Sequence, residues 1–465
     1  MKRFLAPTLL IVAVAGSAYF LKRQHVNKQL IQSARPQQQT QASEKDQDTK
    51  QAEPEEFISP LGKSSILQTL GTQDTRKNDY TIYGYLPYWT IEETDNFRLE
   101  NLTDVAYFGL YIEPDGSFLK TQEGEEGPVP NPGYNAWHNN EKLASFIRRA
   151  KRQNVDVALT IISHVDSKST EFLNCEKCWE TFYDNLKDEL AVHKIDDVNL
   201  NFEYYETVDK ETALKYTEFT KFVKRELNKD YDSPEVVVTT FADSLINDRV
   251  SHVPSLAKEA DKLFIMAYDF HIMSADKAAP VSPMGGSGLH AGYDIKTMIK
   301  DYLSYAPPQK LILGVPYYGF NWAKGEEVVV EGSDDNLEGE VDGGSLEEDS
   351  VEKSAEKKQV EIIRDSLTQT YANIMELVEE ENPEILWDEP GQVPYFVYVD
   401  SGNEETEASQ EGVGAKERTV YFENEKSLQV KYRIAKEFDL AGVGIWALGY
   451  DADRAELWEL LEREF

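Results

Sequence analysis

Cysteine and basic residues are scarce in this chain of 465 residues, which has two cysteines and 48 Lys and Arg against 84 Asp and Glu. The formal net charge is −36. Nucleic-acid binding needs clustered Lys and Arg that neutralise phosphates, so this composition excludes a nucleic-acid partner and argues against a polybasic membrane face. Hydrophobic residues still make up 40% of the chain and aromatic residues 11%. That is enough to build a core, which excludes general disorder.

The two cysteines, Cys175 and Cys178, form a single Cys-x-x-Cys motif. A structural zinc site usually takes four ligands, and a second such motif is absent. The surrounding sequence also lacks the βαβ pattern in which a thioredoxin-like redox motif would lie. In an oxidising compartment the pair is interpreted as a small disulfide across a surface turn, with its redox state left open. We expect no metal ion and no cofactor.

The N-terminal segment combines a basic start with an apolar run. Lys2 and Arg3 precede a mostly apolar stretch from Leu5 to Leu21, which two further basic residues follow. At about 1.5 Å per residue the stretch spans roughly 25 Å, the lower limit for crossing a bilayer. We therefore expect residues 1–23 to be an uncleaved membrane anchor or a cleaved signal peptide. Either alternative places the rest of the chain outside the cytoplasm, anchored by its N-terminal helix or secreted.

Two further regions follow the N-terminal segment. Residues 24–78 are rich in Gln, Ser, Thr, Lys and Asp, a composition that buries too little apolar surface to offset ordering, so we predict a disordered polar linker. From residue 79 to 465, short β-rich runs alternate with helical patterns. The eight predicted strands are 80–85, 104–112, 155–162, 198–203, 236–241, 263–269, 311–318 and 442–448, and the clearest helices are 140–153, 212–228 and 427–438.

Eight strands that alternate with helices are the count of a (β/α)8 TIM barrel, an α/β fold. A doubly wound open sheet is the alternative, but no Gly-x-Gly-x-x-Gly follows the first strand. The alternation fails only at residues 323–423, after the seventh strand. Within them, residues 325–358 contain 13 Asp and Glu against three Lys and are predicted to be disordered. A helix at 366–380 and strands at 395–399 and 418–422 predict a small α+β insertion on the C-terminal rim of the barrel.

The fourth predicted strand carries the most informative pattern, DDVNLNFE from residue 196 to 203. Side chains alternate along a strand, so Asn199, Asn201 and Glu203 share one face while the apolar residues share the other. Because the outer face of a barrel packs on helices, the polar set must point inward, where each unsatisfied group costs about 1–3 kcal/mol. Such a set at the C-terminal end of a barrel strand predicts a functional site; an ordinary half-exposed strand is the alternative. A carboxyl group among apolar neighbours tends to stay protonated, which suits a general acid.

Aromatic residues recur at the ends of the other predicted strands. Flat apolar rings beside hydrogen-bonding groups suit the faces of sugars. A single ring of this kind more often belongs to the core, but the coincidence of several at strand ends favours a binding role. The aromatic residues in question are Tyr85, Tyr88, Trp89, Phe108, Tyr268, Tyr317, Tyr318, Trp322 and Trp446.

The strand-four segment resembles the signature of glycoside hydrolase family 18, Asp-Gly-x-Asp-x-Asp-x-Glu, in which Asn is tolerated at several Asp positions. Further similar motifs are MAYDFH at 266–271, GVPYYG at 314–319 and GIW at 444–446. The chain is most similar to the spore-cortex-lytic type of N-acetylglucosaminidase, which shares a motif like WDE at 387–389 and a late Gly-Tyr like 449–450. The resemblance covers about residues 80–322 and 365–465.

This resemblance implies a retaining, substrate-assisted hydrolysis of β-1,4-linked N-acetylglucosamine polymers, either chitin or peptidoglycan. The 2-acetamido carbonyl of the sugar attacks C1 to form an oxazolinium ion, and Glu203 acts as general acid and then base. Tyr268 would bind the acetamido carbonyl. Further substrate contacts are assigned to Asn199, Met266, Asp269, Trp446, Tyr85, Phe108 and Tyr318.

One departure from the family pattern concerns the catalytic chemistry directly. The last Asp before the family's Glu is Asn201 here, which can accept the acetamido N–H but carries no charge. Losing one charge-assisted contact in a shielded site costs about 2.7–4 kcal/mol, or about 10²–10³ in rate. Related N-acetylglucosamine endohydrolases use Asn at this position. The chain is therefore predicted to be a glycoside hydrolase, with a catalytically weak or inactive carbohydrate-binding protein as the alternative. Two further departures, Asp197 and Ser163-His164 in place of glycines, would reshape the cleft.

Overall fold

A computed structural model describes residues 80–125, 127–272, 277–324, 326–330, 358–362, 366–400 and 416–465. The predicted N-terminal segment 1–23 and the predicted linker 24–78 lie outside these residues. Within the described ranges, no helix is long and apolar enough to cross a membrane.

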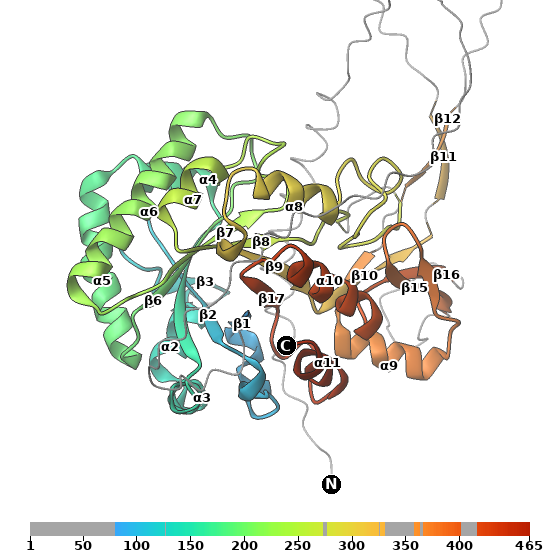
Figure 1. Cartoon of the computed structure of the whole chain (residues 1–465), viewed down its shortest axis with the longest axis horizontal. Helices are drawn as coiled ribbons and strands as arrows, with labels where there is room; N and C mark the ends of the chain where they lie inside the picture. Colours follow the sequence, from blue (N-terminus) through green and yellow to red (C-terminus); the bar gives the residue numbers. More distant parts are fainter. Residues whose placement is uncertain are drawn as a thin grey trace, which may run out of the picture. The chain divides into compact units, whose positions relative to one another are not determined.

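Eight parallel strands close into a barrel, as the sequence predicts (Figure 1). The order around the barrel is β1-β17-β9-β8-β7-β6-β5-β2, so each strand lies beside its neighbour in the (β/α)8 sequence. The barrel strands are β1 (Thr81–Pro87), β2 (Asp104–Tyr111), β5 (Asp156–Ser163), β6 (Asp197–Phe202), β7 (Val236–Phe241), β8 (Lys262–Met266), β9 (Leu311–Pro316) and β17 (Gly442–Trp446).

Helices surround the barrel strands, and several begin at a side chain that caps the first turn. Asn140 accepts a hydrogen bond from the N–H of Leu143 at the start of α3, and Asp209 accepts one from Thr212 at the start of α6. The α-helices in the described ranges are α2 (Pro132–Asn139), α3 (Glu141–Arg152), α4 (Asp166–Leu173), α5 (Glu176–His193), α6 (Lys210–Asp230), α7 (Val253–Glu259), α8 (Ile295–Leu303), α9 (Tyr371–Glu381), α10 (Glu425–Glu437) and α11 (Glu456–Glu464).

The two faces of β6 belong to different layers of the protein. Val198, Leu200 and Phe202 are buried in the layer between the barrel and its helices. The ring of Phe202 stacks on Tyr216 of α6 at 4.7 Å between centroids. The alternating pattern of this strand is thus confirmed, and Asn199 and Asn201 face the barrel interior.

The insertion after β9 is an antiparallel sheet with one helix, α9, packed against it. Its strand order is β13-β10-β16-β15-β14, and Ile374 of α9 lies in one apolar cluster with Phe396 and Val420 of the sheet. The strands are β10 (Tyr318–Ala323), β13 (Ser366–Thr370), β14 (Leu386–Asp388), β15 (Val393–Asp400) and β16 (Lys416–Tyr421).

Two boundaries of the insertion differ from the sequence-based prediction. Its sheet begins at Tyr318, before the expected residue 323, because β10 leaves the barrel to pair with β13 and β16. The predicted helix 366–380 starts only at Tyr371, since Ser366–Thr370 pairs with β10 as a strand. Thr370 then caps α9 by accepting the N–H of Asn373.

Two antiparallel strand pairs complete the described strands. One consists of β3 (Thr121–Gly124) and β4 (Gly127–Pro130), and the other of β11 (Glu326–Val330) and β12 (Lys358–Ile362). Strand β11 lies at the start of the acidic segment predicted to be disordered, 325–358, and β12 begins at its last residue. Residues 331–357 of that segment lie outside the described residues.

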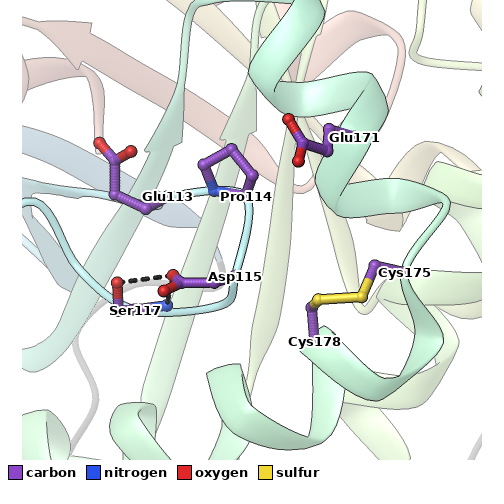
Figure 2. A pocket seen from close by; sticks show the side chains of 7 residues that line it. All are labelled: Glu113, Pro114, Asp115, Ser117, Glu171, Cys175 and Cys178. Atoms are coloured by element: carbon purple, nitrogen blue, oxygen red, sulfur yellow. Dashed lines mark hydrogen bonds between the residues drawn. A yellow bond between two sulfur atoms is a disulfide. The ribbon is translucent and has the colours of Figure 1, made fainter.

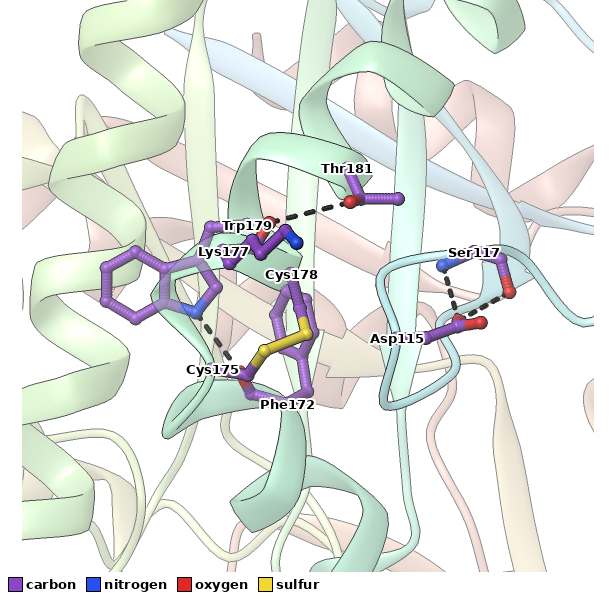
Figure 3. The surroundings of a disulfide bond; sticks show 8 residues. All are labelled: Asp115, Ser117, Phe172, Cys175, Lys177, Cys178, Trp179 and Thr181. Atoms are coloured by element: carbon purple, nitrogen blue, oxygen red, sulfur yellow. Dashed lines mark hydrogen bonds between the residues drawn. A yellow bond between two sulfur atoms is a disulfide. The ribbon is translucent and has the colours of Figure 1, made fainter.

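The Cys-x-x-Cys motif lies where α4 ends and α5 begins, and Cys175 and Cys178 form a disulfide (Figure 3). Beside it, the indole N–H of Trp179 donates a hydrogen bond to the carbonyl of Phe172 at 3.2 Å. The motif therefore has the structural role that the sequence suggested, closing the turn between two helices.

Candidate active site

A hydrogen-bonded network inside the barrel holds the first polar side chain of β6. The Oδ1 of Asn199 accepts a hydrogen bond from the hydroxyl of Tyr85 at 3.1 Å, and its Nδ2 donates to the carbonyl of Val237 at 3.3 Å. Thr239 of β7 lies 2.8 Å from the Tyr85 hydroxyl and 3.2 Å from Nδ2. Asn199 is fully buried, and both ends of its amide are hydrogen-bonded, which removes the penalty of burying it.

The next residue on the same face, Asn201, connects β6 to the carboxyl group of Glu203. Its Nδ2 lies 2.9 Å from Glu203 Oε1 and 3.1 Å from Nε2 of His164, the residue that follows β5. The hydroxyl of Tyr205 donates to Glu203 Oε2 at 3.2 Å. The Oδ1 of Asn201 is buried and has no hydrogen-bond partner among the described residues. Glu203 thus stands at the C-terminal end of β6 with polar groups on both carboxyl oxygens.

The loop that carries Glu203 is anchored from the neighbouring helix. Asp166, at the start of α4, accepts the backbone N–H groups of Tyr205 and Glu206 at 3.2 and 3.0 Å. The hydroxyl groups of Thr170 and Tyr204 lie 3.0 Å apart. These contacts define the direction in which the chain leaves β6, and therefore where the Glu203 carboxyl group lies.

The end of β8 contributes three of the predicted site residues, Met266, Tyr268 and Asp269. Tyr268 is almost fully buried, and this burial raises the pKa of its phenol well above the usual value, with nearby ionisable groups that include Glu203 adding to the effect. Tyr268 therefore remains a hydrogen-bond donor at any physiological pH. Asp269 accepts a hydrogen bond at 2.5 Å from the hydroxyl of Tyr318, the first residue of β10.

Aromatic rings line the mouth of the barrel beside these polar groups. The indole of Trp446 lies 4.8 Å from the ring of Phe108 and 5.4 Å from that of Tyr85, edge-on to both. Trp89 packs 6.4 Å from Trp446 and is 41% exposed. A partly exposed wall of rings next to carboxyl and amide groups is the composition expected of a carbohydrate site.

The structure brings the predicted site residues together. Asn199, Asn201 and Glu203 follow one another along β6, and Asp269 is joined to the rest through Tyr318. One apolar cluster contains the remaining candidates, namely Tyr85, Phe108, Tyr268 and Tyr318, with Met266 and Trp446 packed against it.

Two aromatic assignments change. Tyr317 belongs to the outer layer, where its hydroxyl lies 3.1 Å from that of Tyr432 in α10. Trp322 lies on β10 of the insertion rather than at a barrel strand end.

Sequence reasoning missed three polar neighbours of the site as functional residues: His164, Tyr205 and Thr239. His164 was recognised only as a departure from a glycine motif. Its position directly after the third barrel strand was the available signal, because residues at the C-terminal ends of barrel strands line the site. Tyr205 and Thr239 carried no such pattern, since their roles depend on contacts across strands.

The insertion also contacts the barrel rim through an ionisable pair. Nε2 of His290, in the loop after β8, lies 2.9 Å from Asp388 of β14. Asp388 also accepts the N–H of Gly391 at 2.7 Å. Close by, burial lowers the pKa of His271 to about 4, so this imidazole stays neutral.

A surface pocket elsewhere on the barrel is lined by none of the predicted site residues. It lies between the loop after β2 and the start of α5, with Glu113, Asp115 and Glu171 beside the disulfide (Figure 2). Asp115 accepts hydrogen bonds from Ser117, which lower the pKa of this carboxyl group. Glu113 is paired with Lys168 at 2.8 Å. In the part of the chain that the structure describes, no group of three or more His, Cys, Asp or Glu residues could hold a metal ion.

Comparison with known families agrees with this geometry. The model of the glycosyl hydrolases family 18 matches residues 81–451. The chain belongs to this family.

Similar proteins include a glycosylase and a cortical fragment-lytic enzyme of Bacillus species. The chain is 22% identical over 285 residues to the uncharacterized glycosylase YvbX of Bacillus subtilis (strain 168). This match covers 61% of this chain and 65% of YvbX. It is 23% identical over 366 residues to the cortical fragment-lytic enzyme of Bacillus anthracis, covering 78% of this chain and 68% of that enzyme. The matched region thus spans about two thirds of each relative.

A solved structure has the same fold. The spore cortex-lytic enzyme SleL of Bacillus megaterium QM B1551 superimposes with a TM-score of 0.58 at 18% identity, over 83% of this chain and 74% of SleL.

The Asn199 network predicts the cost of losing one hydroxyl group. Tyr85→Phe removes the 3.1 Å donor of Asn199 Oδ1 and leaves only the longer contact to Thr239 at 3.4 Å, so we expect the free energy of unfolding to fall by about 0.5–1.5 kcal/mol. Chemical denaturation followed by circular dichroism measures this loss. Tyr305→Phe is the matched control, because Tyr305 is 54% exposed. Equal stability of the two variants would contradict the network.

Proposed function

We propose that this family 18 protein hydrolyses β-1,4-linked N-acetylglucosamine polymers by a retaining, substrate-assisted mechanism. One observation carries the proposal. Glu203 is the last of the inward-facing polar side chains along β6, and its side chain is 14% exposed. It lies beside the buried phenol of Tyr268 and the aromatic residues at the mouth of the barrel. A shielded carboxyl group with a fixed orientation is what general acid catalysis requires.

In the first step Glu203 protonates the glycosidic oxygen while the 2-acetamido carbonyl oxygen bonds to C1. The bond between C1 and the glycosidic oxygen breaks, and its electrons remain with the leaving sugar. Tyr268 donates a hydrogen bond to the acetamido group and holds it against C1. In the second step the Glu203 carboxylate removes a proton from water, whose oxygen bonds to C1 and opens the oxazolinium ring with retention.

Asn201 binds the acetamido N–H in this proposal. Its Oδ1 is a buried acceptor with no partner among the described residues, while its Nδ2 is directed at Glu203 and His164. A buried acceptor of this kind gains a full hydrogen bond when an N–H donor binds. The neutral amide supplies no charge to the developing oxazolinium ion, so turnover is expected to be slower than with an aspartate.

A second candidate function rests on the same residue. If the missing charge reduces turnover too far, the cleft with its aromatic wall becomes a carbohydrate-binding site without useful catalysis. Glu203 and the loop anchored by Asp166 favour the enzyme, because a binding site alone has no need of an oriented carboxyl group.

Two polymers present N-acetylglucosamine in the required linkage, chitin and peptidoglycan. The names of similar proteins include cortical fragment-lytic enzymes and a chitinase solved with (GlcNAc)3. Both polymers therefore enter the proposal as substrates. The acidic segment 325–358, with 13 Asp and Glu against three Lys, follows β10 and disfavours heavily anionic wall polymers.

The proposal includes export, because both polymers lie outside the cytoplasm and residues 1–23 have the pattern of an anchor or signal peptide. We expect the protein purified from membrane or culture fractions to carry either the complete N-terminus or one cut near residues 13–18. Intact mass spectrometry of the mature chain measures this. Recovery of the uncut protein from the cytosol alone would contradict export.

Glu203→Gln is expected to lower the rate of hydrolysis by about 10³-fold or more, since the amide cannot deliver a proton. Release of the chromophore from a chromogenic chito-oligosaccharide and of reducing ends from purified peptidoglycan measures it. Glu206→Gln is the matched control, because Glu206 lies in the same loop with an exposed side chain. Equal rates for wild type and Glu203→Gln, with sugar binding intact, would leave only the binding function.

Asn201→Asp is expected to raise kcat, by up to about 10²–10³-fold, because the carboxylate stabilises the oxazolinium ion. Asn201→Ala removes the acetamido acceptor and should lower kcat instead. Single-turnover rates on the chromogenic substrate separate the two effects from product release. A lower kcat for Asn201→Asp would show that the site works best with the neutral amide.

A further inference from the structure

Three side chains meet at one oxygen of Glu203. Nε2 of His164 lies 3.1 Å from Oε1 of Glu203 and 3.1 Å from Nδ2 of Asn201. The same Nδ2 lies 2.9 Å from Oε1. The three atoms form a nearly equilateral triangle, and the side chains of His164 and Glu203 are only 13% and 14% exposed. Water therefore screens these contacts little.

The short distance between Nε2 of His164 and Oε1 of Glu203 indicates that a proton lies on one of these two atoms. A carboxylate oxygen only accepts hydrogen bonds, and so does an unprotonated ring nitrogen. At 3.1 Å two such acceptors repel, so the contact is attractive only when a proton lies on one of them. Either the carboxylic acid donates to the imidazole, or the imidazole N–H donates to the carboxylate.

Asn201 is compatible with both positions of this proton. Its amide nitrogen only donates, so it supports the carboxylate when His164 is protonated and the ring nitrogen when it is not. An aspartate at this position would compete for the proton with two acceptor oxygens. Because a neutral amide cannot hold a proton, His164 is the group beside Oε1 that can.

We propose that His164 is a positioning residue that shares one proton with Glu203. This sharing sets the pH range in which the general acid is protonated and able to react. This inference rests on the proposed hydrolysis and names the group that regulates it. When Glu203 transfers the shared proton to the leaving oxygen, Oε1 and Nε2 are left as two acceptors, and the amide nitrogen of Asn201 can donate one N–H to each of them. When Glu203 takes a proton from water, the pair returns to its starting state.

Phenol groups lie beside this pair. Tyr205 donates to Oε2 of Glu203, and the ring of Tyr111 on β2 lies 5.7 Å from the imidazole. Burial raises the pKa of Tyr111, and likewise those of Tyr85 and Tyr268, so these groups stay neutral. The oxygens of Asp166 accept the backbone N–H groups of Tyr205 and Glu206, which follow Glu203.

A shared proton changes the alkaline side of the pH–rate profile. Two sites that exchange one proton retain it to a higher pH than the carboxyl group alone, because the macroscopic titration belongs to the pair. Removing the imidazole leaves one site. The alkaline limb of kcat/KM should therefore move to lower pH, while the rate at low pH changes little.

The variant His164→Gln tests this, since glutamine donates to Oε1 but does not titrate. We expect the alkaline limb of its kcat/KM profile to move to lower pH by about one unit. At pH values above this limb, kcat/KM of the variant is then about tenfold lower than that of the wild type. His138→Gln is the matched control, because His138 forms a comparable pair with Glu189 at 2.8 Å outside the site. A profile that is lowered equally at all pH values would indicate a structural role and would overturn the proposal.

A second measurement separates this proposal from the proposed function. In the full-length protein with ¹⁵N-labelled histidine, the Nε2 signal of His164 should change its chemical shift in Glu203→Gln, since the carboxyl group that shares its proton is lost. The signal of His138 should not move. If the wild type cleaves no sugar, this shift still supports the shared proton while the hydrolase proposal fails. An unchanged Nε2 signal of His164 would overturn the inference whatever the activity.

Discussion

The cost of burying polar side chains inside a barrel is the constraint on which the site depends. Asn199 and Asn201 are almost fully buried in the barrel interior, so their amide groups need hydrogen-bond partners. Tyr85 of β1 and Thr239 of β7 satisfy Asn199. Because these partners come from different strands, the hydrogen bonds also define the register of β6 in the barrel. The direction of β6 then determines where Glu203 emerges.

The surroundings of Glu203 are held from two sides of the rim. On one side, Asp166 at the start of α4 binds the backbone just after Glu203. On the other side, Tyr318 of the insertion holds Asp269, and Asp388 pairs with His290. The insertion therefore does more than enlarge the rim. Its contacts orient residues that belong to the barrel, so the two parts form the site together.

Much of the fold could be predicted from local patterns, and the errors have physical causes. The eight barrel strands follow from apolar runs of the right length between helical patterns. Residues 366–370 were predicted as helix because their strand pairing with β10 is set by distant residues. Tyr317 and Tyr318 are adjacent and identical in type, yet one hydroxyl meets Tyr432 and the other Asp269. The chain leaves the barrel between them, and no local signal shows that turn.

The sequence alone determined the barrel, the family and the inward-facing file that ends at Glu203, because alternation along a strand and the order of motifs are local properties. It also showed that Asn201 replaces a charged residue. Only the tertiary structure decided which side chains surround this neutral amide. His164 lies 37 residues before Asn201, and hydrogen bonding between them arises because β5 and β6 are neighbours in the closed barrel. Contacts of this kind depend on three-dimensional distance, which spacing along a chain does not report.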